Sequence, residues 1–264
     1  MTNLRRGRGA IAVLAAAALF AALDGPASAR DPFDTLRSNW GAPSAAPRRE
    51  AAPEVAHYVD AEGGRGFVLD LSGQQPLLKF DGSQEIFVLS AVPGPRNDII
   101  YKLDNGATVL RRTSAGGVTL FLPEARGGAP MALKRDEPKP LTAPPTTPAM
   151  LKVLADASTF RIFAASGADV RFDYTSFGQP RTGRERAATA DAMRVAAQAL
   201  ETFAADPDQA SLLAEQVRSV AFVEAEGPAV KVEGDSVVIL LNPDMGPAGR
   251  PSSGAVVAVV GLGV

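Results

Sequence analysis

The chain has 264 residues, no cysteine and one histidine. Disulfides, iron–sulfur clusters and cysteine-ligated zinc are therefore excluded, as is any metal site built on two histidines. Basic and acidic side chains nearly balance, 27 against 29, which argues against an electrostatic hold on nucleic acid. The composition indicates no cofactor.

The first 29 residues have the three parts of a secretory signal peptide. Arg5, Arg6 and Arg8 form a positive start, residues 10–23 are an unbroken apolar run, and Ala27-Ser28-Ala29 fits a cleavage site. A helix of 14 residues rises about 21 Å, which is too short for a hydrocarbon core of about 30 Å. We expect export by the general secretory route and a periplasmic or extracellular location.

Removal of residues 1–29 leaves 24 basic and 28 acidic side chains, a net charge of −4. No later apolar run reaches the 18 residues that a spanning helix needs, so we expect no membrane span after signal cleavage. Residues 30–56, rich in Ala, Pro and charge, are predicted to be a disordered leader. Phe33 and Trp40 are its large apolar groups and would dock on the folded part or on a partner.

Residues 57–133 are predicted to form a small antiparallel β barrel or sandwich, because short apolar runs alternate with turn signals. The candidate strands are 66–71, 77–80, 86–90, 99–103, 108–112 and 118–122.

Asn105-Gly106 predicts a two-residue type I′ hairpin turn, which needs positive φ at both positions. That turn would pair Leu103 with Thr108. It would also pair Tyr101 with Leu110 and Ile99 with Arg112 on one face. On the other face, Lys102 would lie opposite Val109 and Ile100 opposite Arg111.

Residues 134–148 hold five prolines and are predicted to be a stiff linker. Residues 149–264 follow as an α+β module with helices on a small antiparallel sheet. The predicted helices run from a Thr147 cap to about Ser158, over 184–205, and from an Asp206 cap to about Val217, with a short terminal helix after Ser252-Ser253. The predicted strands are 170–175, 220–223, 230–232 and 237–241.

Candidate chemistry in this sequence is sparse. His57 is the one histidine that a catalytic triad could use, and it stands at the module boundary without a nucleophile motif. Six arginines of the second module could hold an anionic glycan or carboxylate, or simply form a solvated helix face. They are Arg161, Arg171, Arg181, Arg184, Arg186 and Arg194.

Candidate binding residues lie on the hairpin of the first module. Asp98 and Asp104 stand at strand ends, and Lys102 and Arg111 lie on its outer face. We assign no catalytic or metal-ligating residue. The sequence favours a non-enzymatic binding or envelope accessory protein whose partner is an envelope protein or glycan.

Two alternatives remain open. Paired carboxylates can hydrolyse glycans without histidine, and the first module carries acidic residues at strand ends and turns. These candidates are Asp70, Asp81, Glu85, Asp98 and Asp104. The second alternative is an inhibitor of an exogenous hydrolase that presents a loop such as 93–97.

Several runs resemble a family of exported proteins from Gram-negative bacteria, known as a domain of unknown function. The matching runs are 66–70, 77–81, 98–102, 109–111, 116–121 and 249–253. Asn97 stands where that pattern has Gly. The resemblance implies export and carries no known activity, fold or site.

Overall fold

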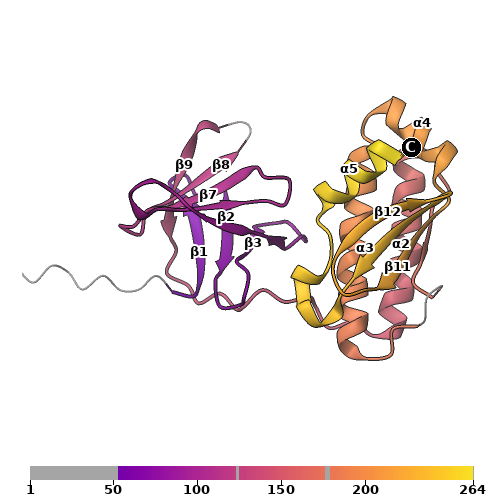
Figure 1. The fold of residues 1–264 in the computed structure, drawn as a ribbon, viewed down its shortest axis with the longest axis horizontal. Helices are drawn as coiled ribbons and strands as arrows, with labels where there is room; N and C mark the ends of the chain where they lie inside the picture. The colour runs from indigo at the N-terminus through magenta and orange to yellow at the C-terminus, as the bar shows by residue number, and fades with distance from the viewer. Residues whose placement is uncertain (1–52, 123–124, 176–178, 264) are drawn as a thin grey trace, which may run out of the picture. The chain divides into compact units, whose positions relative to one another are not determined.

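The computed structural model describes residues 53–122, 125–175 and 179–263 (Figure 1). The predicted signal peptide and most of the predicted leader therefore lie outside the described residues. Residues Ala51–Val264 form one unit. Its first part is a single antiparallel sheet, and its second part is a smaller sheet covered by helices.

The first part is barrel-like. Its strands are β1 (Val55–Asp60), β2 (Gly66–Asp70), β3 (Leu77–Phe80), β4 (Phe87–Val88), β5 (Ser90–Pro93), β6 (Ile99–Lys102), β7 (Thr108–Arg112), β8 (Val118–Leu122) and β9 (Ala125–Leu133). They pair in the order β4-β3-β2-β1-β9-β8-β7-β6-β5. The two outermost strands, β4 and β5, are separated in the chain only by Leu89, so the sheet nearly closes on itself. The predicted α+β class with a barrel-like part is confirmed.

Alternating inward residues fill this sheet, as the pleat of a strand requires. Phe67, Tyr101 and Leu110 are among its fully buried side chains. Phe67 contacts Tyr58 and Phe80, with ring centroids 5.4 and 6.2 Å apart. Aromatic pairs of this kind add stability beyond the area they bury.

Three predicted strands, 77–80, 108–112 and 118–122, match β3, β7 and β8. The single strand predicted at 86–90 is wrong, because the chain turns at buried Leu89 and splits into β4 and β5. The strands β1 and β9 were not predicted. The predicted leader included Val55 and Ala56, but these two residues belong to β1, and Ala56 is buried in the core.

The hairpin between β6 and β7 differs from the predicted two-residue turn. Leu103 donates to Ala107 O at 2.9 Å and accepts from Gly106 N at 2.9 Å. Gly106 has a φ of 82°, whereas Asn105 is not among the residues with positive φ. This is a longer turn with one left-handed Gly and a bulge, so Lys102 pairs with Thr108, and the predicted Leu103–Thr108 and Lys102–Val109 pairs are wrong. Beyond the bulge the predicted register is confirmed: Tyr101 pairs with Leu110, Ile100 with Arg111 and Ile99 with Arg112.

The second part contains α2 (Pro148–Ser166), β10 (Arg171–Asp173), α3 (Gly183–Phe203), α4 (Pro207–Gln216), β11 (Ser219–Glu224), β12 (Ala229–Glu233), β13 (Ser236–Leu241) and α5 (Ser253–Gly263). Its sheet has the order β10-β11-β13-β12. The predicted antiparallel sheet is wrong in its pairing, because β10–β11 and β11–β13 are parallel and only β12–β13 is antiparallel. The helices α3 and α4 return the chain to the start of the sheet, which is the crossover that a parallel pair requires.

Local signals set the helix ends. Thr147, Thr182 and Asp206 each cap a helix with a side-chain oxygen, and Thr182 forms a capping box with Glu185. Helix α2 continues past the predicted end near Ser158, because its apolar residues continue until left-handed Gly167.

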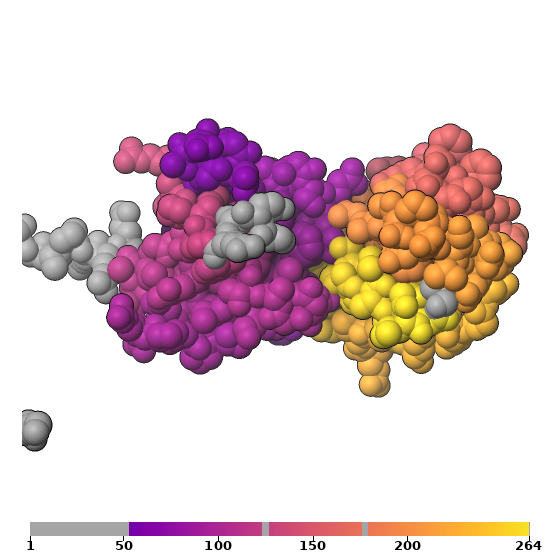
Figure 2. Space-filling model, turned by 90° about the horizontal axis from the view of Figure 1, so that it is seen from above, coloured from indigo at the N-terminus to yellow at the C-terminus, as the bar shows by residue number. Residues whose placement is uncertain are grey.

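Small residues line the buried side of α3. Six alanines of this helix belong to the core, and they allow close approach to the sheet and to α2: Ala188, Ala190, Ala192, Ala196, Ala197 and Ala199. The sheet contributes Val220, Phe222 and Ile239 to the same core. Helix α5 packs against α3 and β12 and is the yellow surface band beside the orange elements in Figure 2. Among the described residues, no helix combines the length and apolar composition that crossing a bilayer requires.

The proline-rich segment 134–147 is tied to both parts. Leu141 N donates to Asp70 Oδ2 at 2.7 Å, and Arg186 Nε donates to Thr146 O at 3.1 Å. Asp70 belongs to β2 and Arg186 to α3. The segment therefore contacts both parts through specific hydrogen bonds.

Candidate functional site

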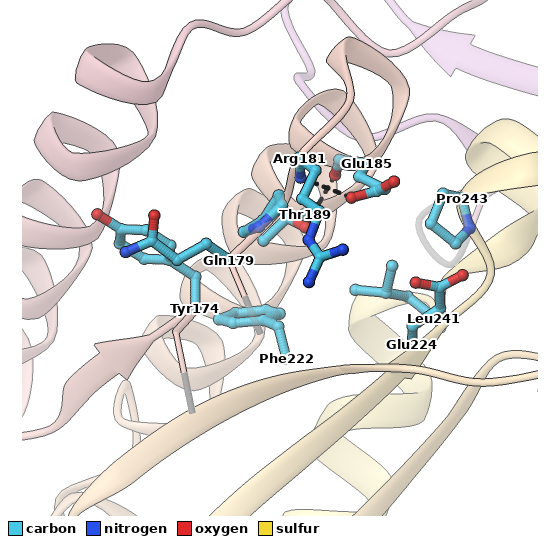
Figure 3. A pocket seen from close by; sticks show the side chains of 10 residues that line it. Tyr174, Gln179, Arg181, Glu185, Thr189, Phe222, Glu224, Leu241 and Pro243 are labelled. Carbon is cyan, nitrogen blue, oxygen red and sulfur yellow. Dashed lines mark hydrogen bonds between the residues drawn. The ribbon is translucent and has the colours of Figure 1, made fainter. Parts of the chain in front are cut away.

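A polar pocket of about 250 Å³ lies at one edge of the second sheet (Figure 3). Tyr174 follows β10, Glu224 ends β11 and Leu241 ends β13. These three strands run parallel, so their carboxyl ends meet at the same edge. In open α/β sheets this edge is where ligands bind.

The start of helix α3 forms the opposite wall. Glu185 N donates to Thr182 Oγ1 at 3.1 Å, and the Glu185 carboxylate accepts from Arg181 N at 2.6 Å. This backbone hydrogen bond is the main cause that lowers the pKa of Glu185, against the opposing effect of desolvation. The Glu185 carboxylate therefore occupies the positive N-terminus of α3. An anionic ligand in the pocket would need another positive group to bind it.

That partner is Arg181. Its guanidinium points into the middle of the pocket, with Phe222 below it and the Glu224 carboxylate on the other side (Figure 3). An arginine can hold a carboxylate or phosphate with two parallel hydrogen bonds, and a carboxylate such as Glu224 can accept from an amine or hydroxyl. The arrangement suits a small polar ligand that carries a negative group and a donor.

The predicted binding residues fall into two places. Asp98 accepts from Arg111 Nε at 2.7 Å and from Ser114 N at 3.1 Å. Asp98 and Arg111, both predicted candidates, therefore form an ion pair in which the carboxylate is buried and the guanidinium is partly exposed. The hydrogen bond from Arg111 is the main cause that lowers the pKa of Asp98. Asp104 lies in the hairpin turn and accepts from Ser252 Oγ at 2.5 Å, and Lys102 lies on β6, half-buried. Whether any of the four binds a ligand stays a prediction.

The six arginines of the second part do not gather at one point. Arg161 pairs with Glu201 at 2.5 Å, and Arg184 pairs with Asp244 at 2.6 Å. Of the six, only Arg181 lines the polar pocket. Sequence reasoning included Arg181 in this set but missed Glu224, because the two residues come to line one pocket only through the three-dimensional fold.

His57 takes part in a polar cluster that the sequence did not predict. Its two ring nitrogens lie 2.7 Å from Asp136 Oδ2 and 3.0 Å from Asp81 Oδ2, and Lys134 lies 3.3 Å from Asp136. Burial lowers the pKa of His57, but the hydrogen bonds with Asp136 and Asp81 outweigh burial and raise it. The cluster links β1, the turn after β3 and the segment after β9.

A second unpredicted cluster is buried between the two parts. Arg250 is 4% exposed and donates from Nε to Asp191 Oδ2 at 2.6 Å and from an Nη to Ile86 O at 3.0 Å. Glu85 is 1% exposed, lies 3.9 Å from Arg250, and accepts from the amide and hydroxyl of Ser253 at 2.9 and 2.6 Å. The barrel, α3 and the start of α5 thus share one buried ion network. Arg250 and Ser253 of this network belong to the run 249–253, which resembles the family pattern.

Within residues 53–122, 125–175 and 179–263, no cluster of three or more His, Asp or Glu side chains is arranged to hold a metal ion.

Fold and pocket together define an α+β protein with a barrel-like sheet and a polar pocket at the carboxyl edge of a second, mixed sheet. The chain belongs to the family described as a domain of unknown function (DUF4908), whose model matches residues 35–260. No curated protein matches the chain, and no solved structure matches it.

Proposed function

We propose that the protein is an exported, non-catalytic binding protein of the cell envelope. We further propose that its pocket at Arg181 receives a negatively charged group of an envelope protein or glycan. The observation that carries this proposal is the Arg181 guanidinium, directed into a polar pocket and faced by Glu224. The signal-like first 29 residues support export.

The carboxylates of the barrel support a binding rather than a hydrolytic function. A glycan hydrolase needs two carboxyl groups that flank the scissile bond across an open cleft. Here Asp70 accepts from Ser72 and Leu141, and Glu85 is buried against Ser253. Asp81, Asp98 and Asp104 accept from His57, Arg111 and Ser252. Each of the five candidates is thus engaged in a structural hydrogen bond.

The test is retention of the purified protein on isolated envelope fractions. We expect the wild-type protein to be retained and Arg181→Gln to lose about tenfold or more in retention, since a charge-assisted contact contributes about 1.5–3 kcal/mol. Arg161→Gln is the matched control, because Arg161 lies at the surface and pairs with Glu201. No retention of the wild-type protein, or equal retention of all three, would contradict the proposal.

Export has its own test. Amino-terminal sequencing of the product from the envelope fraction should begin at Arg30. An intact chain found inside spheroplasts would contradict export while leaving the pocket proposal open.

A second candidate function is supported by the loop before β6. Arg96 and Asn97 are exposed and have left-handed φ values of 58° and 62°, a conformation that costs energy for residues other than glycine. Gly94 N donates to Asp98 O at 2.8 Å, and Asp98 is held by Arg111, so the base of the loop is fixed. An exposed loop with a fixed base suits binding in the cleft of another protein.

The loop predicts an inhibitor of an exogenous hydrolase. Titration against secreted lysozymes and proteases should reduce the activity of one of them, and Arg96→Gly, which relieves the strain, should weaken the inhibition. Unchanged activity across the panel would remove this candidate.

A further inference from the structure

Two opposite charges face the polar pocket and do not pair with each other. The Arg181 guanidinium and the Glu224 carboxylate both line it, on opposite sides (Figure 3). In the part of the chain that the structure describes, neither charged group has a hydrogen bond or an ion pair. Both residues are exposed, so water can satisfy the two charges until a ligand replaces it.

The backbone that carries each charge is fixed. Arg181 N donates to the Glu185 carboxylate at 2.6 Å, and Arg181 O accepts from an Nη of Arg186 at 2.7 Å. Glu224 is the last residue of β11 and pairs in register with Leu241 of β13. The fold therefore presents a cation and an anion to one cavity, and a site that is already arranged costs less to order when a ligand binds.

The nearby charges already have partners. The hydrogen bond from the Arg181 amide is the main cause that lowers the pKa of Glu185, and the Arg181 guanidinium adds to this effect. Glu185 nevertheless bonds to backbone at the start of α3 and not to the guanidinium. Arg184 pairs with Asp244 at 2.6 Å. Arg181 and Glu224 are thus the two charged groups of the pocket that are left for a ligand.

The size of the pocket limits the ligand to a few heavy atoms. Its volume of about 250 Å³ equals that of about eight water molecules and lies below the roughly 300–1,000 Å³ of sites for drug-sized ligands. Three buried apolar residues, Phe222, Leu241 and Pro243, complete the lining. A small molecule with two charged ends and a short apolar body matches this arrangement.

We propose that the pocket binds the zwitterionic group of a small amino acid, with its carboxylate on Arg181 and its ammonium on Glu224. This inference rests on the proposed function, in which Arg181 receives a negative group, and adds the second half of that ligand. A ligand with a carboxylate alone would bring a like charge towards Glu224, and one with an ammonium alone would do so towards Arg181. Only a ligand with both charges pairs both residues.

The same zwitterionic group has two sources. It is present in a free amino acid, and it is present at the end of a larger molecule that leaves one ammonium and one carboxylate unlinked. Both sources offer the pocket the same chemistry, and the probes below distinguish them.

Titration calorimetry of the purified protein tests the proposal. The probes are glycine, both enantiomers of alanine, and β-alanine, which vary the side chain and the spacing of the charges by one carbon. We expect at least one of them to bind. Acetate and methylamine, which each carry one of the two charges, should bind at least about tenfold more weakly than the best probe.

Variants assign the two contacts. Arg181→Gln and Glu224→Gln should each weaken binding of the best probe by about tenfold or more, because each removes a charge-assisted contact. Amidation of the probe should weaken its binding to the wild type but not to Arg181→Gln, and acetylation of its amine should weaken binding to the wild type but not to Glu224→Gln. Glu226→Gln and Arg161→Gln, exposed and outside the pocket, are the matched controls and should bind as the wild type does.

One more probe separates the two sources. γ-Glutamylalanine keeps the α-ammonium and α-carboxylate of its glutamate free at the end of a larger molecule. Binding as tight as that of the best free amino acid would identify an unlinked end as the ligand. A loss of about tenfold or more would identify a free amino acid, because the pocket then has no room for the attached chain.

Two results would overturn the inference. If no probe binds at millimolar concentrations, the pocket takes no amino acid, although the proposed function still stands if envelope retention depends on Arg181. If a probe binds equally well to Glu224→Gln, the ammonium contact does not exist. Amino acid binding without envelope retention would instead refute the proposed function alone. Far-ultraviolet circular dichroism of each variant confirms that the fold is retained.

Discussion

The two parts of the unit use charged residues differently. In the barrel, charged side chains bridge segments distant in sequence: Asp98 holds Arg111, and His57 holds Asp81 and Asp136. The second part also has pairs that bridge distant segments, such as Arg184 with Asp244, but in addition its acidic side chains, such as Glu185 and Asp206, accept hydrogen bonds at helix ends. This difference leaves Arg181 as a charge directed into a pocket.

The cores differ as well. Among the described residues, the barrel is filled mainly by aromatic and leucine side chains, whereas the second core combines six alanines of α3 with valines and ten Leu, Ile, Phe and Met side chains. Close helix packing through alanines leaves little tolerance for added volume. The network at Arg250 joins the two parts, and the variants below test how strongly it does so.

The largest effect is expected for Arg250→Ala. It leaves the buried carboxylates of Asp191 and Glu85 without their cation, and removal of one partner from a buried ion pair costs about 3–5 kcal/mol. Urea denaturation measures the free energy of unfolding. Arg184→Ala removes an exposed pair with Asp244 and should change it by about 0–1 kcal/mol. If Arg250→Ala lowered the free energy of unfolding no more than this control, the network at Arg250 would not stabilise the junction of the two parts.

Gly249→Ala should destabilise the same junction by about 1–3 kcal/mol, the usual cost of a forced backbone shift. A Cβ at this position would lie 1.9 Å from Asn242 O, and backbone cannot give way as a side chain can. Gly254→Ala is the control, since its nearest neighbour would lie at 3.6 Å and alanine favours the helix α5. The control should be neutral or stabilising in thermal denaturation, and equal losses in both variants would contradict the steric argument.

Thr182→Ala should cost about 1 kcal/mol, because it removes the cap of α3. It also removes the hydroxyl that bonds to Glu185 in the wall of the pocket, so envelope retention should fall along with stability. Thr202→Ala, which removes only a hydroxyl bonded to Gln198 O within α3, should change neither. Unchanged thermal stability of Thr182→Ala would indicate that the capping box contributes nothing.

The smallest effect concerns His57 and depends on pH. Because its pKa is raised in the folded protein, its protonated form contributes stability fully below about pH 6.5, and this contribution disappears as the pH rises through the raised pKa. His57→Gln should therefore lower the unfolding temperature by about one to two degrees at pH 5.5 and by less at pH 8.5. Asp136→Asn should reduce the same pH dependence, and parallel curves for wild type and both variants would refute this role.

Sequence patterns predicted the barrel better than the second sheet. Strands β3, β7 and β8 have alternating apolar residues between turn signals, and almost every barrel strand pairs with its neighbour in sequence. Strand β9 escaped prediction because Gly127-Gly128 and Pro130 read as a loop, although Pro130 pairs with Thr119 within the sheet. The parallel pairs of the second sheet join strands separated by two helices or by β12, and no local pattern encodes such a pairing.

The candidate site shows the same limit. The apolar spacing of 184–205 predicted α3 without its capping box at Thr182 and Glu185, and the placing of Arg181 and Glu224 around one pocket depends on the crossover. Asp98 and Arg111 were predicted as candidates. They lie together because β6 and β7 pair Ile100 with Arg111, and this register was predicted correctly. The ion pair of Arg250 with Asp191 spans 59 positions of the chain, and only the three-dimensional structure reveals it.

The turn at Leu89, between β4 and β5, has a consequence for strand addition by other chains. A β-sheet with open rims offers unpaired amides on which another chain can add a strand. Here one short segment pairs with the sheet at both ends of the strand order, because β4 pairs with β3 and β5 pairs with β6. Release of this single segment would expose two rims at once, so damage there should promote fibre growth more than damage at any other barrel turn.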